Sequence, residues 1–141
     1  MKKFYSVIDT AAEPLVTRTM QHVLIHELAK QLKGKISYYT SEDPDTLGSQ
    51  KMVRLMLDQL EHIDGVIFLQ LRQFCYGPVM NVDLLKEMLD KNCEIHFLRE
   101  KISLCNVDEL DEKFTLLLVY HRIYSENKDG GFLRRLIEMQ G

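Results

Sequence analysis

This chain of 141 residues has few cysteines and no excess of positive charge. It has 3 cysteines and no C-x-x-C motif, so the sequence indicates neither a disulfide framework nor a paired-thiol zinc site. Lys and Arg number 18 against 21 Asp and Glu, which leaves a net charge of −3. Proteins that bind nucleic acid or anionic membranes usually carry a basic excess, so neither partner is expected.

Long apolar runs are missing as well. The longest apolar stretch near the C-terminus, 114–120, is far shorter than the roughly 20 residues that span a membrane. The apolar run that follows Lys2 and Lys3 is too short for a signal peptide. No internal repeat or linker divides the chain. We therefore expect a cytoplasmic protein with reduced cysteines, built as one domain over residues 1–141.

The composition, 45% hydrophobic and 28% charged, is that of a globular protein. Short β-rich runs alternate along the chain with apolar residues at helical spacing. The predicted strands are 4–8, 36–40, 66–69 and 93–98; the predicted helices are 14–32, one that starts near 45 or 49 and runs to 60, 79–90, 106–124 and 132–139. Strands separated by single helices form right-handed crossovers. The sequence therefore predicts a three-layer α/β domain: a mostly parallel sheet of about four strands, helices on both faces and a long C-terminal helix.

Two glycines are predicted to end elements. Lys33-Gly34 is a stop signal for the first helix, and Asp64-Gly65 is a turn before the third strand. The apolar residues at helical spacing in the first helix include Met20, Val23, Leu24, Leu28 and Leu32.

Polar residues follow every predicted strand. They are Asp9 and Thr10; Thr40, Ser41 and Glu42; Gln70, Arg72 and Gln73; and Arg99 and Glu100. In an open parallel sheet, ligands bind beyond the carboxyl ends of the strands, where the strand order reverses. Arg72 and Arg99 at that edge are suited to hold a phosphate or carboxylate in bidentate fashion. Asp9 is suited to act as a general base or to bind the hydroxyls of a sugar. The alternative is that polar residues there only form turns and caps.

Other motifs are weaker. His22 and His26 are spaced to share one helix face, followed by Glu27, but no third ligand is evident, so surface histidines are favoured over a metal site.

Cys75 follows the third predicted strand, where it is either a nucleophile with Arg72 nearby or a buried structural residue. No G-x-S-x-G, G-x-G-x-x-G or P-loop motif occurs. Neither a metal nor a cofactor is expected.

The order of elements resembles the N-terminal domain of the resolvase/invertase serine recombinases, most clearly over 49–103. The helix at 106–124 would match the dimerisation helix of that family. Its catalytic positions differ, since the first strand carries Asp9 in place of the nucleophilic Ser and Val7 in place of an Arg. The family's Asp-Arg-x-x-Arg cluster is replaced by the residues 72–76. DNA strand cleavage needs both the Ser and the arginines, so this activity is not expected.

A closer likeness is to the sporadic carbohydrate cluster family of bacterial surface-polysaccharide gene clusters. The segments that carry it are 21–23, 57–60 with 64–67, and 94–100, and the likeness covers about residues 4–112. The chain departs from this family at 72–74, where a Leu-Pro would be expected. The resemblance implies a role in carbohydrate, including lipopolysaccharide, biosynthesis, and it implies a pathway without specifying a reaction.

Two hypotheses follow from these observations. In the first, the protein binds a sugar phosphate or nucleotide sugar at the strand-end edge, either as a binding protein or as an enzyme that acts on this ligand. Its ligand-binding residues are then Thr10, Ser41, Gln70, Arg72 and Arg99, and its catalytic residues are Asp9 and Glu100. In the second, it is a catalytically inactive homodimeric interaction module that pairs through 106–124. Charged groups that converge at the strand ends favour the first hypothesis, and a filled edge favours the second.

Overall fold

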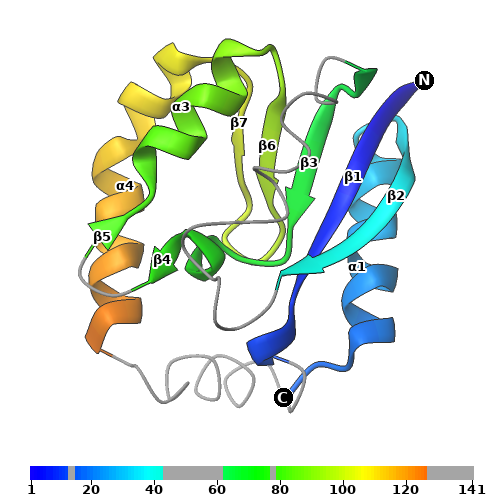
Figure 1. The fold of residues 1–141 in the computed structure, drawn as a ribbon, viewed down its shortest axis with the longest axis horizontal. Helices are drawn as coiled ribbons and strands as arrows, with labels where there is room; N and C mark the ends of the chain where they lie inside the picture. Colours follow the sequence, from blue (N-terminus) through cyan, green and yellow to red (C-terminus); the bar gives the residue numbers. More distant parts are fainter. Residues whose placement is uncertain (13–14, 43–61, 77–78, 127–141) are drawn as a thin grey trace.

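The computed structural model describes residues 1–12, 15–42, 62–76 and 79–126 (Figure 1). Its strands are β1 (Lys2–Asp9), β2 (Gly34–Glu42), β3 (Gly65–Phe68), β4 (Cys75–Tyr76), β5 (Val79–Met80), β6 (Glu94–Phe97) and β7 (Ile102–Leu104). Its helices are α1 (Arg18–Gln31), α3 (Val82–Asp90) and α4 (Val107–Glu126), with short 3-10 helices η1 (Thr10–Ala12) and η4 (Leu71–Phe74). The helix predicted before residue 60 and the one at 132–139 lie outside the described residues.

The main sheet has the strand order β2-β1-β3-β6-β7. The first four of these strands are parallel, and β7 is antiparallel to β6. The predicted α/β architecture with a mostly parallel sheet is confirmed, but the strand count is five and not four. The strand β7 was missed because it has only three residues and follows β6 through a tight hairpin, in which Lys101 has a φ of 58°.

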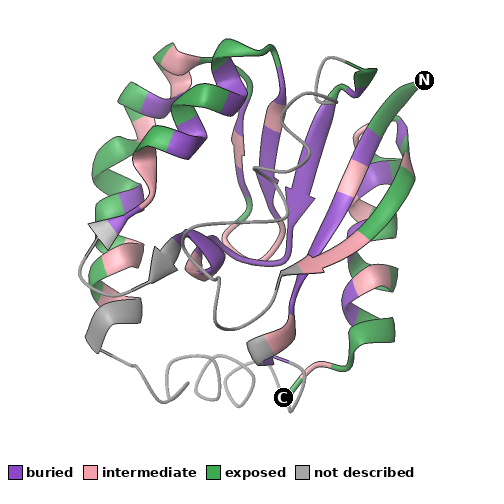
Figure 2. Ribbon diagram, viewed as in Figure 1, coloured by how far each residue is buried: buried purple, intermediate pink, exposed green. Residues whose placement is uncertain are grey.

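The helices lie on both faces of the sheet (Figure 1). Ile25 and Ala29 of α1 pack against Phe4 and Ile8 on one face. On the other face, α3 and α4 cover a larger core that contains the rings of Phe68, Phe74 and Phe97. The central strand β3 is buried along its whole length, as Figure 2 shows and as its continuous apolar run predicts.

The buried stripe of α1 differs from the predicted apolar spacing. It consists of Gln21, Ile25 and Ala29, whereas Met20, Val23 and Leu24 are exposed. The helix begins at Arg18 because Thr17 is its N-cap and accepts a hydrogen bond from the Met20 N–H. The apolar periodicity of α1 alone did not identify its buried face, because that face includes the polar Gln21 and the small Ala29, which pack with Ile25 towards β1.

The stop predicted at Lys33-Gly34 is confirmed, because α1 ends at Gln31 with Leu32 as its C-cap, but neither Gly34 nor Gly65 is a turn residue. Lys33, not Gly34, adopts the left-handed conformation after α1, with a φ of 60°. Gly34 and Gly65 are instead the first residues of β2 and β3. A Cβ at Gly34 would lie 2.5 Å from the Phe4 ring, and one at Gly65 would lie 2.7 Å from the Glu94 carbonyl oxygen. Close approach of neighbouring chains, and not a turn, requires glycine there.

The boundaries of the last two helices are defined by caps. The predicted helix at 79–90 starts later, since 79–80 form β5 and Asn81 caps α3 by accepting from the Leu84 N–H. The α4 start is close to its prediction: Asn106 accepts from the Glu109 N–H at 2.8 Å, and Glu109 accepts from the Cys105 N–H at 3.0 Å. Within the described parts of the chain, no helix is long and apolar enough to cross a membrane.

Candidate functional site

The strand order reverses between β1 and β3. From β1 the chain passes through α1 to β2 on one side, whereas from β3 it passes through α3 to β6 on the other side and over the opposite face. A crevice forms at such a point because the two connections diverge, and ligands of open α/β sheets bind there. Asp9 ends β1, and Gln70 lies two residues after β3.

A chain of side-chain hydrogen bonds crosses this point. The Gln70 Nε2 donates to the Asp9 Oδ2 at 2.6 Å, and the Arg99 Nη1 donates to the Gln70 Oε1. We refer to these three residues as the Asp9–Gln70–Arg99 chain. It joins the ends of β1, β3 and β6, and it connects a carboxylate to a guanidinium through an amide that both donates and accepts. Charged groups therefore converge at the strand ends.

Two buried glutamines hold the backbone around this chain. Gln73 accepts from the Gln70 N–H at 3.0 Å and donates to the carbonyls of Val7 and Ile8 at 3.2 Å each. Gln21 accepts from the Asp9 N–H at 2.9 Å and donates to the Asp9 carbonyl at 3.0 Å. Rotation or displacement of the strand end would break several of these bonds, so the position of Asp9 is preorganised.

The predicted site residues differ in accessibility. Asp9 and Gln70 are 0% exposed, so in this structure the Asp9 carboxylate accepts a hydrogen bond from the Gln70 amide and positions it. Glu100 is half-buried and accepts from the Leu71 N–H at 2.9 Å, which fixes the start of η4. The remaining predicted residues, Thr10, Ser41, Arg72 and Arg99, are all half-buried. The structure thus joins Asp9, Gln70 and Arg99 directly, with the Arg99 Nη2 buried, and places the half-buried residues Thr10, Ser41 and Arg72 at the ends of the same strands or just after them.

Sequence reasoning gave Gln21 and Gln73 no functional role. The signal for Gln21 was present, because an amide that lies four residues before Ile25 and eight before Ala29 belongs to the buried stripe of α1. A buried amide must find hydrogen-bond partners, and the nearest are those of β1. For Gln73 no local pattern exists, since its partners are the carbonyls of a strand more than 60 residues away.

The two histidines of α1 each contact a hydroxyl. The His22 Nδ1 lies 3.1 Å from the Ser6 Oγ, and the His26 Nδ1 lies 3.4 Å from the Tyr39 hydroxyl. Burial and the nearby Arg18 charge lower the pKa of His22. The described residues contain no group of three potential metal ligands. The Cys75 side chain lies outside what the structure describes.

Comparison with known proteins adds no family: no protein-family model matches the chain, and a search of curated proteins finds no match.

Proposed function

We propose that the protein binds a phosphorylated or nucleotide-linked sugar in the cytoplasm, at the edge formed by the carboxyl ends of β1, β3 and β6. The observation that carries this proposal is the Asp9–Gln70–Arg99 chain at the strand-order reversal. An arginine whose guanidinium is held by a buried amide and carboxylate is oriented before a ligand arrives, which lowers the entropy cost of binding an anion. Arg99 therefore contacts the phosphate, and Arg72 on η4 supplies the second positive charge.

The sugar itself would contact the half-buried hydroxyl and carboxyl groups of this edge. Thr10 follows β1, Ser41 lies next to Ile8 across the β1–β2 pair, and Glu100 follows Arg99. Hydroxyls of sugars pair with such groups as both donors and acceptors. Glu100 is the carboxylate to test for proton transfer, because Asp9 has no exposed surface. A role in surface-polysaccharide biosynthesis agrees with the family resemblance.

A thermal-shift screen against sugar phosphates and nucleotide sugars tests this proposal. A ligand at a hundred times its dissociation constant should stabilise the fold by about 2.7 kcal/mol. We expect Arg99→Ala and Arg72→Ala to abolish the shift. Lys35→Ala is the control, since Lys35 is an exposed cation near the start of β2, at the opposite edge of the sheet, and it should leave the shift unchanged. No shift with any ligand, or an equal shift in Arg99→Ala, would contradict the proposal.

A second function is favoured by a different surface. On α4 the side chains of Phe114, Leu116, Leu118 and Val119 are between 37% and 51% exposed. Four large apolar side chains exposed within six positions of one helix are typical of an interaction surface. Phe114 and Leu118 share one side of α4, and Leu116 and Val119 share an adjoining side. The occupant that we propose is a second copy of the chain, since a helix surface that pairs with itself produces a twofold dimer. In this case the protein is an interaction module.

Sedimentation equilibrium distinguishes the second function. We expect the wild-type protein to be dimeric, and Leu118→Glu or Val119→Glu to be monomeric, because a carboxylate in an apolar interface is not solvated. Val23→Glu is the matched control, since Val23 is 48% exposed on α1 and away from this surface. A wild-type protein that stays monomeric at every concentration would rule out the dimer.

A further inference from the structure

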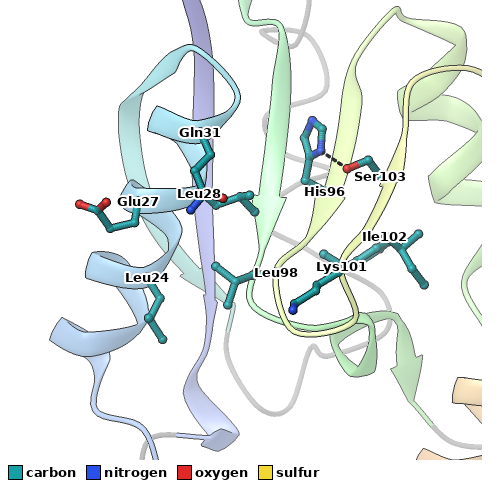
Figure 3. Close-up of a pocket in the computed structure, with 10 residues that line it drawn as sticks. Leu24, Glu27, Leu28, Gln31, His96, Leu98, Lys101, Ile102 and Ser103 are labelled. Atoms are coloured by element: carbon teal, nitrogen blue, oxygen red, sulfur yellow. Dashed lines mark hydrogen bonds between the residues drawn. The ribbon is translucent and has the colours of Figure 1, made fainter.

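A groove separates α1 from the β6–β7 hairpin, on the sheet face that α1 only partly covers. Its volume is about 570 Å³, which is within the range of small-molecule sites. Leu24 and Leu28 line it from α1, and Leu98 and Ile102 line it from the hairpin (Figure 3). None of the residues assigned above to the sugar site lines this groove.

Three polar side chains form a hydrogen-bonded relay beside these apolar residues. His96 and Ser103 are register partners on the antiparallel strands β6 and β7, and the His96 Nδ1 lies 2.7 Å from the Ser103 Oγ (Figure 3). Glu94 lies two residues before His96 and therefore on the same sheet face, with its Oε2 3.0 Å from the His96 Nε2. Both His96 and Ser103 line the groove. The imidazole thus has a carboxylate on one nitrogen and a hydroxyl on the other.

These contacts define the protonation of the ring. A carboxylate can only accept, so the His96 Nε2 carries the proton and donates to Glu94. The Nδ1 lone pair then faces Ser103, whose hydroxyl donates to it. Burial lowers the pKa of His96, so the ring is neutral at pH 7 and able to accept a proton. Burial would raise the pKa of Glu94, but hydrogen bonds from Lys2 and His96 outweigh it and lower that pKa, so Glu94 is a carboxylate.

We propose that Ser103 is the nucleophile of an acyl-transfer site, with His96 as its general base and Glu94 as a positioning residue. A hydroxyl, an imidazole and a carboxylate in series also activate serine in hydrolases on unrelated folds, although there the hydroxyl lies on Nε2 and the carboxylate on Nδ1, whereas His96 has these partners exchanged. The substrate is a carboxylic ester whose apolar acyl group lies against Leu24, Leu28 and Leu98. Lys101 also lines the groove, and its positive charge makes the groove more favourable for an anionic transition state.

The reaction balances with water as the only co-reactant. The Ser103 Oγ attacks the carbonyl carbon while its proton passes to the His96 Nδ1. The tetrahedral intermediate expels the alkoxide, which takes that proton and leaves as an alcohol, so that Ser103 is acylated. Water then attacks the acyl carbon, again losing a proton to His96, and the acid is released with the serine hydroxyl restored.

A fluorophosphonate probe with peptide mapping tests the nucleophile. Attack of the Ser103 oxygen on phosphorus releases fluoride, and we expect one adduct per chain, at Ser103. Ser103→Ala should give none. His96→Gln, which can still hydrogen-bond Ser103 but cannot take its proton, should slow labelling by about 100-fold or more. Ser6→Ala is the matched control: Ser6 also bonds a histidine, His22 at 3.1 Å, but is fully buried and away from the groove, so labelling should persist.

Hydrolysis of p-nitrophenyl butyrate gives a second readout. The wild-type rate should fall only as the pH drops below the ordinary histidine pKa of 6.5, because neutral His96 is the base. Glu94→Gln removes the carboxylate that raises the pKa of His96, so the loss of rate should begin at a lower pH. The other charged groups that influence this pKa are Lys2, which lowers it, and Glu109, which raises it. A folded wild-type protein that is not labelled overturns the proposal, as does labelling at Ser103 that His96→Gln leaves unchanged.

Discussion

Replacing Phe74 with alanine is expected to lower the free energy of unfolding by about 4 kcal/mol. Phe74 is completely buried, and its ring packs edge-on against Phe68 at 4.8 Å and Phe97 at 5.7 Å between centroids. Truncation to alanine loses the transfer free energy of the ring and leaves a cavity among side chains of three separate elements.

The same substitution should weaken ligand binding at the proposed sugar site. Phe74 anchors η4, which carries Arg72 and the Gln73 amide that holds Gln70. Urea unfolding measures the stability, and the thermal-shift screen measures the binding. Phe114→Ala is the matched control because Phe114 is 37% exposed on α4, and its cost should stay below about 1.5 kcal/mol. An equal cost at both positions would indicate that Phe114 is covered, as by a second copy of the chain.

Gly65→Ala is expected to lower the free energy of unfolding by about 3 kcal/mol. A Cβ at this position would lie 2.7 Å from the Glu94 carbonyl oxygen and 2.8 Å from the Glu94 Cβ. Gly65 and Glu94 are register partners on β3 and β6, so relief of the contact requires the two central strands to move apart. Neither strand can move freely, because β3 is fully buried between the two helix layers.

Chemical denaturation checks this prediction. Ser37→Ala alters an exposed position of β2 and removes a 3.4 Å hydrogen bond from the Ser37 hydroxyl to the Phe4 carbonyl, so it should change the stability by no more than about 1 kcal/mol. Because Glu94 is displaced in Gly65→Ala, fluorophosphonate labelling of Ser103 should also slow, while the fold persists at low temperature. Unchanged stability in Gly65→Ala would mean that the spacing of β3 and β6 is not the constraint that requires glycine.

Features that depend only on residues close together in the chain were predictable from the amino-acid sequence. The continuous apolar run at 66–69 predicted a central, doubly buried strand, and β3 is such a strand. The helix predicted at 106–124 starts within one residue of α4, because its cap joins Asn106 and Glu109, which are only three residues apart. The alternation of strands and helices predicted the parallel sheet, and with it the edge at which Asp9, Gln70 and Arg99 meet.

Contacts between segments far apart in the chain determine which side chains at that edge are hydrogen-bonded to one another and which are accessible to solvent. The burial of Asp9 and its contact with Gln70 depend on the pairing of β1 and β3, whose residues are 61 positions apart in this contact. The relay of Ser103, His96 and Glu94 likewise depends on β7, a three-residue strand that no periodicity marks, and on its register against β6. A shift of one residue would turn the Ser103 side chain to the other face. Register between strands is set by packing over the whole sheet, so no pattern within one segment reveals it.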